Sequence, residues 1–270
     1  MEELQNDKEM SFLGHLEELR WRLVKSAIAI VVVAVILFIY AGPIVKIVYL
    51  RMADSNFPTY RFFCWLSNLV GMGDALCGVD IPIRWQAFEM MSQFSTTMYF
   101  SIVGAIIITF PFLFYQIWQF LKPALKESEL KMSRGIVFWS SLLFFLGILF
   151  GYYVVSPLTV QFFGTFQITE EVKNIITIGS YLSLITTTTL FSGLFFELPI
   201  LIYLLTKMGL IGSEMLKKFR KHALIAILIL SAIITPPDII SQIIVTFPIL
   251  IMYEIGIFVA KRVEKKALVN

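Results

Sequence analysis

Four charged side chains crowd into residues 15–22 (HLEELRWR), directly before a long apolar run. On a helix Glu18 and Arg22 lie four positions apart, and Glu17 and Arg20 lie three positions apart, so each pair can form an ion pair. Charge is costly beside hydrocarbon, and a cluster held there needs a reason. Two interpretations stay open. The segment is a surface helix joined by ion pairs worth roughly 0.2–0.5 kcal/mol each, or it is an acidic site for a cationic partner that Arg20 and Arg22 orient.

A second acidic segment, with Glu127 and Glu129, follows the next long apolar run. Residues 115–125 (YQIWQFLKPAL) connect the end of this apolar run to the two glutamates. Within them, Trp118 is typical of a membrane interface, and Pro123 ends or bends a helix. The two glutamates are either solvated loop charges or a second carboxylate site on the same side of the membrane.

A third acidic residue, Glu197, lies inside an apolar run, ten residues before Lys207 at its border. At the helical rise this corresponds to a depth of about 15 Å. We expect its carboxyl group to be protonated or hydrogen-bonded, and we expect Pro199 to kink the helix. An ionisable residue at such a depth indicates a functional site.

The last apolar segment carries two further polar residues, Gln242 and Glu254. Polar groups inside a membrane can bind partner helices. For Glu254 an interfacial ion pair with Lys261 is an equally good interpretation, so both stay open.

These side chains must be held by membrane-spanning helices. The 270-residue chain is 58% hydrophobic and only 15% charged, whereas soluble domains are about one quarter charged. Because lipid admits only helices or closed barrels and no barrel pattern is visible, we predict a single all-α polytopic membrane domain over residues 1–270. The predicted spans are 23–42, 95–115, 135–155, 181–206, 223–235 and 239–260.

Basic residues indicate the orientation. All but five of the 22 Lys and Arg fall on one side of this arrangement. By the positive-inside rule that side is the cytoplasm, which holds both termini, including the amphipathic segment 1–22 and the tail 261–270. The five on the other side are Lys46, Arg51, Arg61, Arg84 and Lys173.

The final hairpin looks short. Residues 223–235 reach only about 20 Å as a helix, less than a hydrocarbon core. The turn contains Pro236, Pro237 and Asp238, of which Pro236 suits a first helical position and Asp238 favours the helix dipole. We therefore expect the last two helices to be short, and the hairpin either thins the bilayer or stops before its far side.

The long connection 43–94 is predicted to lie outside the cell, with apolar pieces that can form short surface helices. It holds both cysteines, Cys64 and Cys77. An oxidising compartment permits a disulfide, worth roughly 3 kcal/mol by loop closure. Two unpaired thiols are the alternative.

The sequence offers little for catalysis. The two histidines, His15 and His222, lie far apart, and no metal-ligand spacing, nucleophile motif or phosphate-binding loop is visible. We expect no enzyme activity, no cofactor, no metal and no nucleic-acid partner.

Together these segments resemble one family, TatC, the multi-spanning core subunit of the twin-arginine protein translocase. The resemblance runs over roughly residues 12–262. It is carried by these pieces: HLEELR at 15–20 with Arg22, YQIW at 115–118 with Phe120, PAL at 123–125, FELP at 196–199, TPPD at 235–238 with Ser241 and Gln242, and EIG at 254–256.

The resemblance implies a concave six-helix scaffold in the inner membrane that binds twin-arginine signal peptides of folded passenger proteins. Glu18 and Glu129 would hold the arginine pair, with Glu127 as an alternative to Glu129, and with Arg20, Arg22 and Phe120 in the same site. Glu197, Gln242 and Glu254 would contact single-span partners of the TatA/TatB type in a machine driven by the proton gradient, and self-association is left open. The long outer loop and its cysteines depart from the family pattern.

A proton-coupled secondary transporter that uses Glu197 is the alternative from another class. Such a protein would favour inverted repeats with broken helices in both halves. No internal repeat is apparent, and the acidic cytoplasmic sites would be unexplained. A purely structural membrane scaffold is the third interpretation.

Overall fold

The computed structural model describes residues 12–54, 56–69, 86–87, 90–122, 135–169, 176–234 and 239–267. Within these ranges the fold is all-helical, and the single β-bridge joins Gln86 to Thr177. The elements are α1 (Phe12–Ile39), α2 (Ala41–Ile44), η1 (Val45–Tyr49), η2 (Leu50–Ala53), α3 (Pro58–Leu69), α4 (Ser92–Leu121), α6 (Ile136–Phe150), η5 (Gly151–Val155), α7 (Ser156–Thr165), α8 (Ile178–Phe196), α9 (Leu198–Lys207), α10 (Ser213–Lys218), α11 (Arg220–Ile234) and α12 (Ile239–Ala267).

The spanning helices confirm the predicted polytopic membrane fold. Among the described residues, five helical stretches are long and apolar enough to cross a membrane. They are Leu16–Ile39, Ser92–Leu121, Ile136–Thr165, Ile178–Lys207 and Gln242–Lys265. The remaining predicted span, 223–235, corresponds to α11, which has 15 residues and reaches about 22 Å.

The last two helices differ from each other. As expected, α11 is short, but α12 extends over 29 residues, so the prediction of a short last helix needs correction. The apolar part of α12, residues 239–260, is already longer than α11, and the helix continues beyond it through the mostly charged residues 261–267. Lys and Glu are good helix formers, so leaving the apolar layer does not end the helix.

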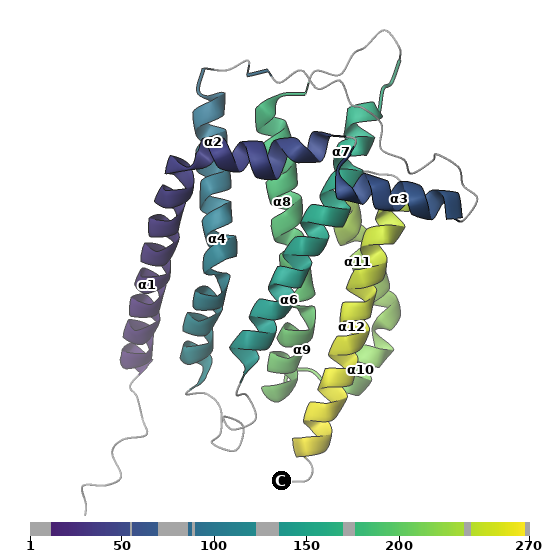
Figure 1. The fold of residues 1–270 in the computed structure, drawn as a ribbon. Coiled ribbons are helices and arrows are strands. Elements are labelled where there is room, and N and C mark those ends of the chain that lie inside the picture. The colour runs from purple at the N-terminus through teal and green to yellow at the C-terminus, as the bar shows by residue number, and fades with distance from the viewer. Residues whose placement is uncertain are drawn as a thin grey trace, which may run out of the picture.

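The helices stand side by side in a row (Figure 1). Helix α1 packs on α4, α4 packs on α6 and α8, α9 packs on α12, and α11 packs on α12. The first turn of α1 and the last turn of α12 lie on the same side of the bundle, at the lower ends of the helices, together with the last turn of α4 and with α10 (Figure 1). An even number of crossings therefore fits the fold.

Residues 41–54 and 56–69, which we call the cap, cross the helices on the opposite side of the bundle, below the outermost turns of α4, α7 and α8 (Figure 1). The cap is held by a buried cluster in which Tyr49, Met52 and Tyr60 pack against side chains of the spanning helices such as Phe100. Tyr181 donates a hydrogen bond to the Tyr49 carbonyl at 2.9 Å. The apolar pieces of the outer connection thus form surface helices, as expected.

Pro157 shapes the third span, and the cap compensates for the helical hydrogen bond that this proline cannot make. Pro157 has no N–H, so it cannot bond the carbonyl of Tyr153 four residues earlier. The preceding turn, η5, is a wide π-type turn, and Thr59 of the cap donates its hydroxyl to that Tyr153 carbonyl. Tyr60 donates to the Pro157 carbonyl at 3.2 Å, and burial raises the pKa of this phenol, so it stays neutral. The cap therefore supplies a donor to the carbonyl that Pro157 leaves without its usual helical partner.

The fourth span breaks where the sequence predicted a kink. Helix α8 ends at Phe196, Glu197 forms a turn, and α9 begins at Leu198, with Pro199 in its first turn. Above the break α8 lies very close to α6, because a Cβ on Gly147 would meet the Ser192 carbonyl oxygen at 2.7 Å. A glycine there lets the two backbones approach and brings Glu197 toward α6.

Candidate functional site

The N-terminal charges form a small cluster between α1 and α4, which we call the charged cluster: Glu18, Arg22 and Gln116. Arg22 donates through Nε to Glu18 Oε1 at 3.0 Å, and its Nη2 also bonds that oxygen. Its Nη1 reaches the side-chain oxygen of Gln116 at 3.5 Å. The predicted ion pair between Glu18 and Arg22 is therefore present, and the further bond from Arg22 to Gln116 joins the first two spans.

Position makes the charged cluster accessible. It lies near the first turns of α1 and the last turns of α4, on the side of the bundle where both described chain ends lie (Figure 1). The side chains of Arg22 and Glu18 are 21% and 26% exposed, whereas Gln116 is buried. An incoming cation can thus reach the carboxylate, while the amide behind it is fixed by packing. Both bonds from Arg22 end on Oε1 of Glu18.

The other residues predicted for this site either lie on α1 and α4 outside the charged cluster or lie outside the described residues. Glu17 and Arg20 are both exposed on α1, and the described ion pairs do not include them. Phe120 is half-buried near the end of α4. Glu127 and Glu129 lie outside the described residues, so the second acidic contact stays a prediction.

Sequence reasoning missed Gln116. It stands within the YQIW segment next to Trp118, and both are buried at 7% exposure. Its signal in the sequence is a glutamine between aromatic residues near the end of an apolar run, because a polar side chain buried at such a position needs a hydrogen-bond partner. Its contact with Arg22 spans 94 residues of sequence, which no helical spacing indicates.

Glu197 lies at the break between α8 and α9, facing α6. Ser140 of α6 donates its hydroxyl to Glu197 Oε2 at 2.8 Å, so the carboxyl group is hydrogen-bonded, as the sequence led us to expect. Ser140 itself is fully buried. The other oxygen, Oε1, is buried without a hydrogen-bond partner among the described residues. An unsatisfied buried acceptor is costly, and it marks this carboxyl group as available to a further donor.

The polar residues of the last helix join α12 to α11. Gln242 donates through Nε2 to the Leu228 carbonyl at 3.3 Å. Glu254 forms an ion pair with Arg220 at 2.7 Å. The interpretation that pairs Glu254 with Lys261, on the same helix, is therefore wrong. Helix packing brings Arg220 closer than a residue two turns away. Both members of this pair are about half exposed, so the pair contributes little stability.

The remaining predicted residues are only partly within the structure. Cys64 is half-buried on α3, and Cys77 lies outside the described residues, so their pairing stays a prediction. The hairpin turn with Pro236, Pro237 and Asp238 also lies outside them. In the described part of the chain, no group of three or more His, Cys, Asp or Glu side chains is arranged to hold a metal ion.

Comparison with known proteins gives a consistent result. The family model described as "Sec-independent protein translocase protein (TatC)" matches residues 14–248. A TatC protein from Blattabacterium sp. subsp. Periplaneta americana is 38% identical over 265 residues, covering 97% of this chain and 100% of that protein. TatCy from Bacillus subtilis is 33% identical over 259 residues, covering 96% and 92% of the two chains. A crystal structure of a protein described as "Twin Arginine Translocase Receptor- TatC" superposes with a TM-score of 0.68 at 29% identity, covering 93% of this chain and 99% of that one.

A family match over most of the chain agrees with the six motifs and with the helical fold. The charged cluster, the buried Glu197 and the broken fourth span lie at the positions by which the sequence resembled this family. The chain therefore belongs to the TatC family of Sec-independent protein translocases, membrane proteins that transport other proteins and are not enzymes.

Proposed function

We propose that this chain is the receptor subunit of a twin-arginine translocase and that the charged cluster binds the arginine pair of a signal peptide. The observation that carries the proposal is the carboxylate of Glu18, which already holds one guanidinium, that of Arg22. A site that fits an internal arginine fits the same group on a ligand. The protein in the similar crystal structure is called a twin-arginine translocase receptor, which supports the assignment.

The chemistry favours arginine over lysine. A guanidinium is planar and donates two parallel hydrogen bonds to a carboxylate, whereas an ammonium is a point charge without this geometry. One carboxylate per arginine requires a second acidic residue. We assign that role to Glu129, with Glu127 as the alternative, and we assign Arg20 to orienting the peptide and Phe120 to its apolar flank.

The orientation of the protein follows from its charges. Most of the described Lys and Arg residues lie on the side of the bundle that carries the charged cluster, and by the positive-inside rule this side faces the cytoplasm. Folded passengers would be received there, with both termini on the same side of the inner membrane. The cap would then face the outside.

Partner contacts are assigned to the polar groups of the later spans. Glu197 has one buried carboxyl oxygen without a described donor, and a partner helix could supply that donor. We therefore assign Glu197, together with Gln242 and Glu254, to contacts with single-span TatA/TatB-type proteins during transport driven by the proton gradient. A second copy of this chain is a further candidate for these contacts.

Peptide binding to the purified protein tests the proposal. A fluorescent twin-arginine peptide should bind the wild type, and the same peptide with two lysines should bind more weakly. Glu18→Gln should weaken binding at least about tenfold, because it removes a charge-assisted pair. The matched control is Glu17→Gln, which alters an exposed neighbour outside the charged cluster and should leave affinity within about twofold. Equal affinity for both peptides, or equal losses in both variants, would reject the assignment.

The unpartnered oxygen of Glu197 also favours the alternative, a proton-coupled transporter. The two functions separate in proteoliposomes that contain a pH-sensitive dye. Proton flux that disappears in Glu197→Gln would support the transporter. Absence of flux from protein that still binds the twin-arginine peptide would support the receptor.

A further inference from the structure

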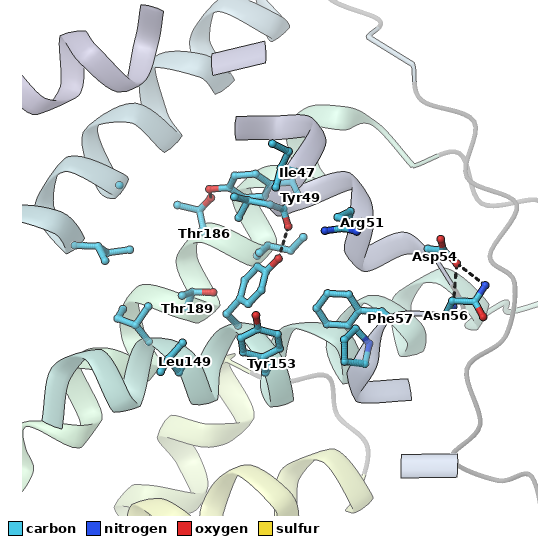
Figure 2. Close-up of a pocket in the computed structure, with 17 residues that line it drawn as sticks. Ile47, Tyr49, Arg51, Asp54, Asn56, Phe57, Leu149, Tyr153, Thr186 and Thr189 are labelled. Carbon is cyan, nitrogen blue, oxygen red and sulfur yellow. Dashed lines mark hydrogen bonds between the residues drawn. The ribbon is translucent and has the colours of Figure 1, made fainter. Parts of the chain in front are cut away.

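A cavity of about 730 Å³ opens beneath the cap, away from the charged cluster and from Glu197. Its walls come from four parts of the chain that are distant in sequence: the cap, the middle of α4, the α6–η5 segment and the outer half of α8. Figure 2 shows Ile47, Tyr49 and Arg51 on the cap side and Leu149 and Tyr153 on the opposite wall. The volume is typical of a ligand-binding pocket, about 300–1,000 Å³.

The inner wall offers a ligand mainly apolar surface, because most of its hydroxyl groups, those of Tyr49, Tyr152, Thr186 and Thr189, are already bonded. The hydroxyls of Tyr49 and Thr186 bond each other at 2.8 Å. Thr189 bonds Ser156, and Tyr152 donates to the Val48 carbonyl. The remaining wall is aliphatic, with Ile107, Ile148, Leu149 and Ile185 among its residues. Such a wall suits a hydrocarbon chain.

The mouth of the cavity is charged. Arg51 is exposed and has no ion-pair partner among the described residues. Asp54 and Asn56 line the same mouth, and Asp54 Oδ1 accepts from the backbone N–H of Asn56 at 2.9 Å and from its side chain at 3.2 Å. The cation and the anion thus stand three residues apart, and they are not bonded to each other.

The cavity lies at the level where a bilayer changes from headgroups to hydrocarbon. Leu149 and Ile148 belong to a stretch that can span the membrane, whereas Arg51 lies in the cap that crosses the outer parts of the helices. Tyrosines line the cavity between these levels, and tyrosine is typical of that interface. Leu149 and Ile47 are 52% and 60% exposed, so the cavity opens toward lipid.

We propose that this cavity binds one zwitterionic phospholipid of the phosphatidylethanolamine class from the leaflet on the capped side. Its phosphate bonds the guanidinium of Arg51, whose planar fork suits phosphate oxygens. Its ammonium lies against the carboxylate of Asp54. One acyl chain follows the aliphatic wall between α6 and α8 and continues into the bilayer.

Charge complementarity selects this headgroup. A phosphatidylglycerol would satisfy Arg51 but would leave Asp54 facing a headgroup that carries no cation. A phosphatidylcholine carries three methyl groups on its nitrogen and cannot donate hydrogen bonds to the carboxylate. Only a headgroup with both a phosphate and a donating ammonium matches both residues at the mouth.

Native mass spectrometry of the purified full-length chain tests the proposal. The protein in detergent is titrated separately with palmitoyl-oleoyl phosphatidylethanolamine, phosphatidylglycerol and phosphatidylcholine, and the one-lipid adduct is measured. The wild type should retain phosphatidylethanolamine most strongly. Arg51→Gln should weaken that binding about tenfold, because it removes the charge-assisted bonds to phosphate. Asp54→Asn should abolish the preference for phosphatidylethanolamine over phosphatidylglycerol.

Arg61→Gln is the matched control, since Arg61 is an exposed arginine of the cap outside the cavity. It should leave the adduct unchanged, and elution as a single peak on size exclusion shows that each variant is folded. Equal retention of the lipid by Arg51→Gln and wild type would overturn the site. Equal or stronger retention of phosphatidylglycerol by the wild type would overturn the headgroup assignment.

Discussion

The hydrogen bond between Ser140 and Glu197 should contribute measurably to the stability of the bundle. Ser140→Ala removes the donor and leaves a second carboxyl oxygen of Glu197 buried without a partner, beside Oε1, which already lacks one. A buried polar group that loses its partner costs about 1–3 kcal/mol, and the cavity left by one hydroxyl adds little. We therefore expect Ser140→Ala to lower the free energy of unfolding by about 2 kcal/mol.

A double-mutant cycle assigns that loss to the hydrogen bond. The free energy of unfolding is measured in mixed micelles for wild type, Ser140→Ala, Glu197→Leu and the double variant. In the Glu197→Leu background no acceptor remains, so Ser140→Ala should cost less than about 0.5 kcal/mol. Ser141→Ala is the neighbouring control, because the Ser141 hydroxyl donates to Val137 within its own helix and that carbonyl keeps its helical bond.

The same loss from Ser140→Ala in both backgrounds would refute the reasoning. It would mean that the serine stabilises α6 by packing alone and that the carboxyl group of Glu197 gains nothing from it. A loss from Ser141→Ala as large as that from Ser140→Ala would be equally damaging, because it would reflect helix propensity rather than the contact between the two spans.

Two further predictions concern how the helices are held. Thr59→Val leaves the Tyr153 carbonyl without its cap donor and should cost about 1–2 kcal/mol of unfolding free energy, whereas Thr97→Val, which loses only a bond within its own helix, should cost less than half of that. Gly147→Val places a Cβ 2.7 Å from a backbone oxygen of α8 and should abolish recovery of folded protein on size exclusion, whereas Gly42→Ala, with open space around it, should not. Wild-type recovery of Gly147→Val would show that α6 and α8 can separate without loss of the fold.

The helices could be predicted well from the sequence because each signal is local. A run of about 20 apolar residues marks a span whatever lies elsewhere in the chain, and Pro199 breaks its helix through a backbone bond four residues away. The end of α12 was predicted less well. Hydropathy marks where a helix leaves the membrane, and this helix continues past that border.

Contacts between helices were predicted poorly because sequence spacing relates residues only within one helix. Glu254 was considered with Lys261, two turns away on α12, but packing of α11 against α12 gives it Arg220 instead. Thr59 was not flagged at all, since its role depends on a proline 98 residues further along the chain. The same limit hid Gln116 behind Arg22.

The contact of Arg22 with Glu18 has a consequence for selectivity in the proposed receptor. An incoming cation must compete with an arginine that is already in place, so the net gain from one ligand arginine is only the difference between two similar bonds. A lysine, without the planar fork, would compete poorly. A ligand with two adjacent arginines can offset this competition, because its second guanidinium binds a second carboxylate with no further loss of translational freedom. Internal occupancy by Arg22 would thus convert a general attraction for cations into a requirement for a pair.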